Sequence, residues 1–177
     1  GKWGAANPAS LERQVLERLG AEGRAVVLRT SWVYGPVGKN FLLTMLRLQG
    51  EREQLGVVAD QVGCPTATAA LAQACWGIVW HQVQGVHHWS DAGAASWYDF
   101  AVAIAELGQA AGLLQNPARI LPIRTADYPT PAQRPSYSLL DCSASRAAMQ
   151  LPPQHWRTAL EQVIGHVVAD PARLCRL

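Results

Sequence analysis

Short apolar runs alternate along this chain with longer stretches in which apolar residues recur every three or four positions. A short apolar run bounded by glycine, proline or polar residues is typical of a buried strand. The three-to-four spacing is typical of an amphipathic helix. On this basis strands are predicted over residues 25–28, 55–59, 86–90 and 120–123.

Helical spacing occurs between these runs. Ser10, Thr66 and Ser96 stand where helix N-caps are expected, and Asp99 completes a capping-box pattern after Ser96. Alternation of helices and strands favours an α/β fold. The prolines within residues 125–136 predict an extended loop without helix. Helices are predicted over residues 11–19, 40–48, 66–83, 97–108 and 154–168.

Composition places the chain among globular proteins. Its 177 residues suffice for one domain or most of one, and 49% hydrophobic against 16% charged residues excludes a disordered chain. A net charge of +2 without a Lys/Arg cluster argues against nucleic-acid binding. We expect no membrane span and no secretion signal. The four scattered cysteines contain no Cys-x-x-Cys, so we expect free thiols and a cytoplasmic location.

The segment from Arg29 to Pro36 carries the first candidate chemistry. It follows the strand predicted at 25–28, and the carboxyl end of a buried strand is where open α/β sheets bind ligands. An arginine, a hydroxyl, an indole and a phenol there could hold an anion and stack on a ring. The alternative that Trp32 and Tyr34 only cap a core stays open at this point.

The same segment, Arg-Thr-Ser-Trp-Val-Tyr-Gly, resembles part of the dTDP-4-dehydrorhamnose reductase family of extended short-chain dehydrogenases/reductases. Residues 58–66, 88–101 and 125–141 resemble the same family in the same order. The resemblance implies the end of a Rossmann-like parallel sheet plus a small α/β substrate-binding domain. It would divide the chain into residues 1–36, the last helix and strand of the Rossmann-like part, and residues 37–177, the substrate domain with an interleaved return to that sheet.

The activity implied by the resemblance is reduction of the 4-keto group of dTDP-4-dehydro-L-rhamnose to dTDP-L-rhamnose with NADPH or NADH. The family uses a glycine-rich turn for the dinucleotide and a Tyr-x-x-x-Lys pair for proton transfer. Neither pattern occurs here, because the four tyrosines are followed, four positions later, by Gly38, Val102, Ala132 and Asp141. We therefore expect no catalytic residue in this chain and interpret it as the substrate-binding portion, with the cofactor held mostly by upstream residues.

Six residues inherit roles from the resemblance. Asn40 could equally cap a helix, and Gln61 could only tie its loop; Arg134, fixed between loop prolines, suits a diphosphate. The family can use Mg²⁺, but the sequence identifies no metal ligands. The expected substrate-binding residues are Trp32, Asn40, Gln61 and Arg134, and the expected cofactor-binding residues are Ser31 and Tyr34.

Partners and alternatives follow from the same resemblance. We expect a dTDP-sugar as ligand, and either a homo-oligomer or a complementary N-terminal domain, because the strand near residues 26–30 would otherwise expose an edge. One alternative is a non-catalytic, reductase-like binding or regulatory subunit. Another is a different sugar-nucleotide epimerase or dehydratase.

Overall fold

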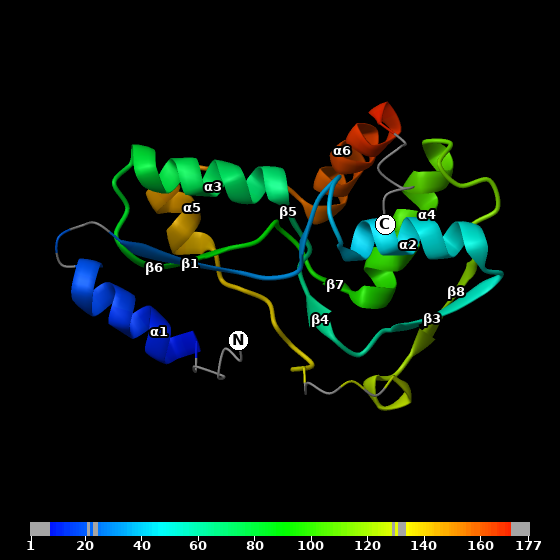
Figure 1. Ribbon diagram of the computed structural model, residues 1–177, viewed down its shortest axis with the longest axis horizontal. Coiled ribbons are helices and arrows are strands. Elements are labelled where there is room, and N and C mark those ends of the chain that lie inside the picture. Colours follow the sequence, from blue (N-terminus) through cyan, green and yellow to red (C-terminus); the bar gives the residue numbers. More distant parts are fainter. Residues whose placement is uncertain (1–7, 21, 23–24, 129, 131–133, 171–177) are drawn as a thin grey trace.

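The computed structural model describes residues 8–20, 22, 25–128, 130 and 134–170. It has the expected α/β fold, in which parallel strand pairs alternate with helices (Figure 1). The elements are α1 (Pro8–Val15) with a π-helical turn (Leu16–Gly20), β1 (Val26–Thr30), β2 (Val33–Tyr34), α2 (Phe41–Glu51), β3 (Gln54–Val58), β4 (Val62–Gly63), β5 (Thr66–Ala67), α3 (Thr68–Trp80), β6 (Gly85–Trp89), β7 (Ala95–Ser96), α4 (Trp97–Ala110), β8 (Arg119–Ile123), a 3-10 turn (Thr125–Asp127), α5 (Ser143–Met149) and α6 (Trp156–Ala169).

Two longer parallel pairs organise the molecule. β1 pairs with β6, and β3 pairs with β8. Figure 1 shows α3 and α5 on one side of the β1–β6 pair and α1 on the other, while α2, α4 and α6 gather at the end where β3 and β8 lie. The short pairs β2–β5 (parallel) and β4–β7 (antiparallel) lie between these two ends.

Each end of the molecule has its own hydrophobic core. The smaller one packs Ala74, Ile78, Trp89 and Met149 against β1. The larger one packs α2, α4 and α6 together, and the fully buried side chains of Phe100, Ile104 and Leu160 belong to it. The smaller core unites residues far apart in sequence. The division at residue 36 and the interleaved return to the sheet remain predictions.

The helix over residues 154–168 was predicted well. α6 buries Trp156, Leu160, Val163, Ile164 and Val167 at the expected spacing. The capping box was also correct: Ser96 Oγ accepts from the Asp99 amide, and the Asp99 carboxylate accepts from the Ser96 amide.

Other local predictions were wrong. α3 starts at Thr68, and Thr66 does not cap it, because Thr66 belongs to the short strand β5. The loop prediction for 125–136 missed the 3-10 turn at Thr125–Asp127, and α5 was not predicted at all. α1 starts at Pro8, before the expected cap at Ser10, and Leu11 is exposed.

Among the helices of the described residues, none is long and apolar enough to cross a bilayer.

Candidate functional site

Trp32 lies just beyond the carboxyl end of β1, in a backbone conformation with φ of 50°. A bulky residue rarely adopts this left-handed conformation, so its surroundings must hold it there. The Trp32 carbonyl accepts from the Thr66 amide (3.1 Å), and its indole stacks on Trp97 with ring centroids 3.7 Å apart and planes 10° apart. A Cβ on Gly63 would lie 2.7 Å from the indole, so the ring also requires the glycine.

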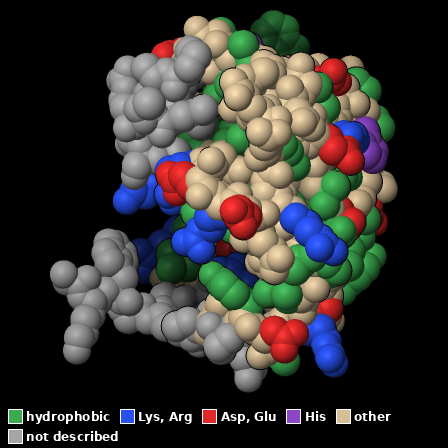
Figure 2. Space-filling view, turned by 90° about the vertical axis from the view of Figure 1, so that its right-hand side faces the viewer, with side chains coloured by type: hydrophobic (Ala, Val, Ile, Leu, Met, Phe, Trp, Pro, Cys, Tyr) green, Lys and Arg blue, Asp and Glu red, His purple; other side chains and the backbone are tan. Residues whose placement is uncertain are grey.

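A pocket of about 650 Å³ lies beside this stack, between α2, β3 and the segment that follows the 3-10 turn. Phe41, Trp97 and Tyr128 supply aromatic surface to it, and Phe41 contacts Trp97 with ring centroids 4.8 Å apart. Trp97 therefore faces the pocket while Trp32 supports it from behind. Figure 2, which faces the end of the molecule containing β3 and β8, shows a hollow in which basic and hydrophobic side chains are visible, with acidic side chains on the surface beside it.

The charged side chains in this pocket have one sign. Arg52 and Arg134 are the charged residues among its described lining, which contains no Asp or Glu. Gln61, only 8% exposed, adds a side-chain amide. A pocket with two guanidinium groups and aromatic walls suits an anion joined to a ring, because guanidinium pairs with phosphate and aromatic faces stack on planar groups.

Gln61 is fixed by a chain of hydrogen bonds at the pocket edge. Its Nε2 donates to Thr125 Oγ1 (3.1 Å), and that hydroxyl donates to Asp60 Oδ1 (2.6 Å). The Thr125 amide also donates to the Asp60 carboxylate (2.9 and 3.0 Å). The hydroxyl bond, followed by the amide bond, lowers the pKa of Asp60.

The other predicted site residues lie away from the pocket lining. Asn40 caps α2: its Oδ1 accepts from the Leu43 amide, and its Nδ2 donates to the carbonyls of Gly35 and Val37. Its side chain is thus occupied by its own turn, as the capping alternative expected.

Ser31 and Tyr34, the expected cofactor residues, differ in position. Ser31 is partly buried and donates to the Cys64 carbonyl (3.4 Å). Tyr34 is 1% exposed and packs edge-on against Phe100 in the larger core, where burial raises the pKa of its phenol. Its ring offers no surface to a ligand in this conformation, so its assigned role remains a prediction that its position does not favour.

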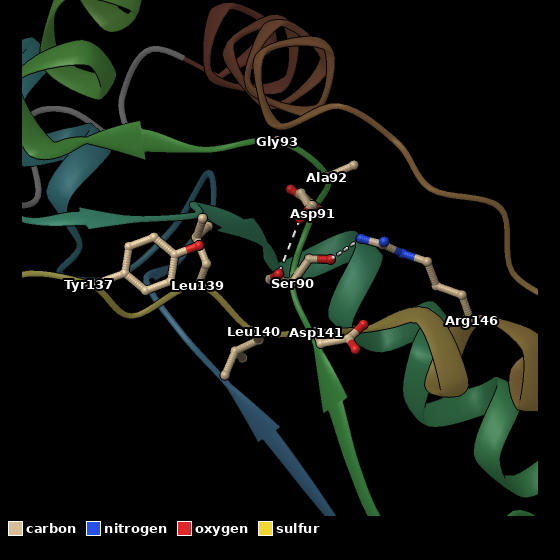
Figure 3. A pocket seen from close by; sticks show the side chains of 9 residues that line it. All are labelled: Ser90, Asp91, Ala92, Gly93, Tyr137, Leu139, Leu140, Asp141 and Arg146. Carbon is tan, nitrogen blue, oxygen red and sulfur yellow. Dashed lines mark hydrogen bonds between the residues drawn. The ribbon is translucent and has the colours of Figure 1, made fainter.

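A second pocket, of about 450 Å³, opens at the carboxyl end of β6 (Figure 3). Arg146 reaches toward Ser90 and donates to its carbonyl (3.3 Å), while Asp91 Oδ2 accepts from the Ala67 amide. Burial raises the pKa of Asp91 to about 6. This pocket also contains Asp141, so its two carboxylates make it less suited than the first to an anion.

None of the described thiols lines either pocket. Cys64, Cys75 and Cys142 are free, and burial raises the pKa of Cys64 to about 12, which keeps this thiol protonated. Among the described residues, no three His, Cys, Asp or Glu side chains lie close enough together to hold a metal ion.

Of the aromatic and charged residues that line the larger pocket, sequence reasoning missed four. Phe41 and Trp97 were read as helix positions, and Tyr128 as part of a loop. Arg52 looked like one of several charged residues after a helix. The missing signal is three-dimensional, because the parallel pairing of β3 with β8 brings Arg52 and β3 close to Tyr128, Thr130 and Arg134. Arg52, Arg134 and Gln61 share one chemical feature: each lines the pocket and has a side chain with N–H groups.

Comparison with known proteins gives a consistent result. The family model described as "RmlD substrate binding domain" matches residues 6–169. A dTDP-4-dehydrorhamnose reductase of Aggregatibacter actinomycetemcomitans is 41% identical over 146 residues, covering 79% of this chain and 50% of the relative. The chain spans about half the length of the curated relatives it matches.

Solved structures agree with that match. A dTDP-4-dehydrorhamnose reductase of Bacillus anthracis in complex with NADP is 34% identical with a TM-score of 0.73, covering 80% of this chain and 48% of that one. The Clostridium acetobutylicum reductase is 30% identical with a TM-score of 0.78, covering 94% of this chain and 59% of that one. The earlier resemblance, and the Rossmann-like fold class it implied, are confirmed.

Proposed function

This chain belongs to the RmlD substrate binding domain family, and we propose that it is the sugar-nucleotide-binding portion of a dTDP-4-dehydrorhamnose reductase. The whole protein would reduce the 4-keto group of dTDP-4-dehydro-L-rhamnose with NADPH or NADH and release dTDP-L-rhamnose. The tyrosine and lysine for proton transfer would come from residues outside this chain.

The observation that carries the proposal is the pocket with two arginines, aromatic walls and no carboxylate among its described lining. A dTDP-sugar has a thymine ring, a diphosphate and a deoxysugar. Arg134 and Arg52 would pair with the diphosphate, because a guanidinium offers several donors in one plane to phosphate oxygens. Phe41, Trp97 or Tyr128 would stack on thymine, and Gln61 would bond a phosphate or sugar oxygen.

Trp32 does not line the larger pocket, so it would border the reacting sugar where the ligand extends past Trp97 toward the end of β1. Trp32 follows the carboxyl end of a parallel strand, where α/β sheets place ligands, and its indole is rigidly held. Ser31 precedes it and would lie nearest the nicotinamide. A family relative was solved with NADP, which supports NADP(H) as the cofactor of the whole protein; Asn40 would act indirectly, through the start of α2.

The remaining proposals concern organisation. Residues 1–36 would complete a dinucleotide-binding sheet, and residues 37–177 would form the substrate domain. The partner would be a second copy or the dinucleotide domain, placed beside β1, which pairs along one edge with β6. A cytoplasmic site of action would fit a nucleotide-sugar enzyme.

Calorimetric titration of the chain with dTDP-rhamnose and, separately, with NADPH tests the binding half of the proposal. We expect dTDP-rhamnose to bind and NADPH not to bind measurably. The protein expressed from its complete reading frame should oxidise NADPH when dTDP-4-dehydro-L-rhamnose is added. Sugar-nucleotide binding without oxidation would favour a non-catalytic subunit, and failure of both proteins to bind would refute the proposal.

A further inference from the structure

Three consecutive residues, Asp60, Gln61 and Val62, bond both ends of the segment that carries Tyr128 and Arg134. They follow β3, and the ladder between β3 and β8 continues past Val58 through the Ala59 amide, which donates to the Ile123 carbonyl (2.9 Å). The two chains therefore leave the paired strands side by side, at the edge of the larger pocket.

The first end of the segment is held by side chains. Asp60 accepts from both the amide and the hydroxyl of Thr125. The turn that follows is closed on itself, because the Arg124 amide donates to Asp127 Oδ2 (3.1 Å) and the Tyr128 amide donates to the Thr125 carbonyl (3.1 Å). The position of Thr125 thus determines where Tyr128 enters the pocket wall.

The second end is held by backbone. The Val62 amide donates to the Ser136 carbonyl (2.8 Å), and the Ser138 amide donates to the Val62 carbonyl (2.8 Å). Ser138 Oγ adds a bond to the same carbonyl (3.2 Å). Arg134 lies two residues before Ser136, so its backbone is placed by this second attachment.

The middle residue is oriented by the same contacts. Thr125 Oγ1 has one hydrogen, which it gives to Asp60, so it can only accept from Gln61. The Gln61 amide nitrogen must therefore face Thr125, and its carbonyl oxygen is turned elsewhere. A hydroxyl that both accepts and donates fixes the amide orientation more strictly than one bond alone.

We propose that these contacts, which we call the 60–62 clasp, position the ligand-binding groups of the larger pocket, with Asp60 and Thr125 as positioning residues for Gln61, Tyr128 and Arg134. The inference rests on the proposed function for the identity of the ligand. The clasp ties one strand end to both ends of the segment opposite, so that Gln61 and Arg134 approach the ligand from fixed directions. Asp60 itself need not touch the ligand.

The test compares Thr125→Val, which keeps the shape but removes the hydroxyl, with Thr125→Ser, which restores it. Thr158→Val, at an exposed position of α6, is the matched control. In the protein expressed from its complete reading frame, we expect Thr125→Val to raise the Kd for dTDP-rhamnose about fivefold or more. Thr125→Ser and Thr158→Val should stay within about twofold of the unaltered protein.

A double-mutant cycle of Thr125→Val with Arg134→Ala distinguishes loss of arginine positioning from a general loss of structure. Arg134→Ala should weaken binding less in the Thr125→Val background than alone, because the arginine is already misplaced. Full additivity, or a Thr125→Val protein that binds as tightly as the control, would overturn the inference while leaving the proposed function intact.

Amide hydrogen exchange needs no ligand, so it tests the clasp even where the proposed function is wrong. Amide hydrogen exchange at Thr125, Asp127 and Tyr128 should accelerate in Thr125→Val and stay slow in Thr125→Ser and Thr158→Val. If dTDP-rhamnose does not bind the unaltered protein, the proposed function fails, and this exchange pattern still decides on the clasp. Unchanged exchange in Thr125→Val would overturn it.

Discussion

Trp32 and Trp97 stack face to face, with ring centroids 3.7 Å apart and planes 10° apart. One follows β1, and the other begins α4, so the stack joins the two ends of the molecule. Only Trp97 lines the larger pocket; Trp32 lies behind it in a left-handed backbone conformation. The aromatic wall is therefore a two-layer structure whose second layer fixes the first.

Replacing Trp97 tests this arrangement. Trp97→Ala removes contacts with Trp32 and Phe41, and we expect the free energy of unfolding to fall by about 2–4 kcal/mol. Trp97→Phe should lose less. Trp76→Ala, at a position 72% exposed on α3, should change the free energy of unfolding by about 0.5 kcal/mol or less. Urea unfolding of the three variants checks this; equal stability of the two alanine variants would contradict it.

Gly63 offers a sharper test of the same wall. A Cβ there would lie 2.7 Å from the Trp32 ring and 2.8 Å from Ser138 Oγ, so Gly63→Ala should destabilise the chain by about 1–3 kcal/mol. Gly165 lies on α6 with nothing within 4 Å of an added Cβ. Gly165→Ala should therefore raise stability by about 0.5–1 kcal/mol. Thermal unfolding of both variants should show shifts of opposite sign, and two shifts of the same sign would refute the prediction.

The order of most helices and strands could be predicted from the sequence because apolar spacing and helix capping depend on residues close together in the chain. The apolar spacing of α6 and the Ser96–Asp99 box depend on residues within a turn of one another. The Arg29–Pro36 motif lies across the end of β1, which extends to Thr30, two residues beyond the predicted end. The prediction of Thr66 as a helix cap was wrong, although its side chain is chemically suited to capping. Thr66 pairs with Val33 in the β2–β5 pair, and this tertiary pairing overrode the local preference.

Only some residues of the larger pocket could be predicted from the sequence. Gln61 and Arg134 were identified through resemblance, and the structure brings both to one pocket. Arg52 and Tyr128 were not, because their proximity depends on the register between β3 and β8, which no local pattern encodes. Tyr34 illustrates the opposite error: a polar-tipped ring in a promising motif lies in the core, where its hydroxyl has no hydrogen-bond partner within the described structure.

The buried carboxylate of Asp91 should make stability fall as pH rises from 4 to 6. Its pKa is about 6 in the folded chain against 3.8 for an unburied group, so the folded state holds more protons between these values. The resulting contribution to stability is present below pH 3.8 and lost as pH rises through 6. It corresponds to about 2–3 kcal/mol.

Asp91→Asn removes this titration. The free energy of unfolding of the variant minus that of the unaltered chain should therefore increase between pH 4 and pH 6, and then level off. Groups whose pKa is lowered, such as Asp60 and Asp141, titrate in both proteins and cancel in the difference. Urea unfolding at four pH values measures this difference in the free energy of unfolding, with Glu161→Gln on α6 as the control. A flat difference would show that Asp91 titrates normally.

The arginines of the larger pocket should bind the phosphates of the ligand. Arg134→Ala and Arg52→Ala should each raise the Kd for dTDP about tenfold at low salt, because each removes a charge-assisted contact. The loss should shrink in 0.5 M NaCl, since salt screens partly exposed charges over distances beyond about 4–5 Å. Arg157→Ala, which removes a surface ion pair with Glu106, is the control and should leave the Kd unchanged.

Thymidine distinguishes phosphate contacts from a collapsed pocket. It carries the base and sugar of dTDP without phosphate, so its affinity should be the same in Arg134→Ala as in the unaltered chain. It should fall in Trp97→Ala if the aromatic wall stacks on the base. Calorimetric titration of both ligands into each variant makes the comparison. Equal losses for thymidine and dTDP in Arg134→Ala would mean that the arginine supports the pocket wall and does not bind the phosphates.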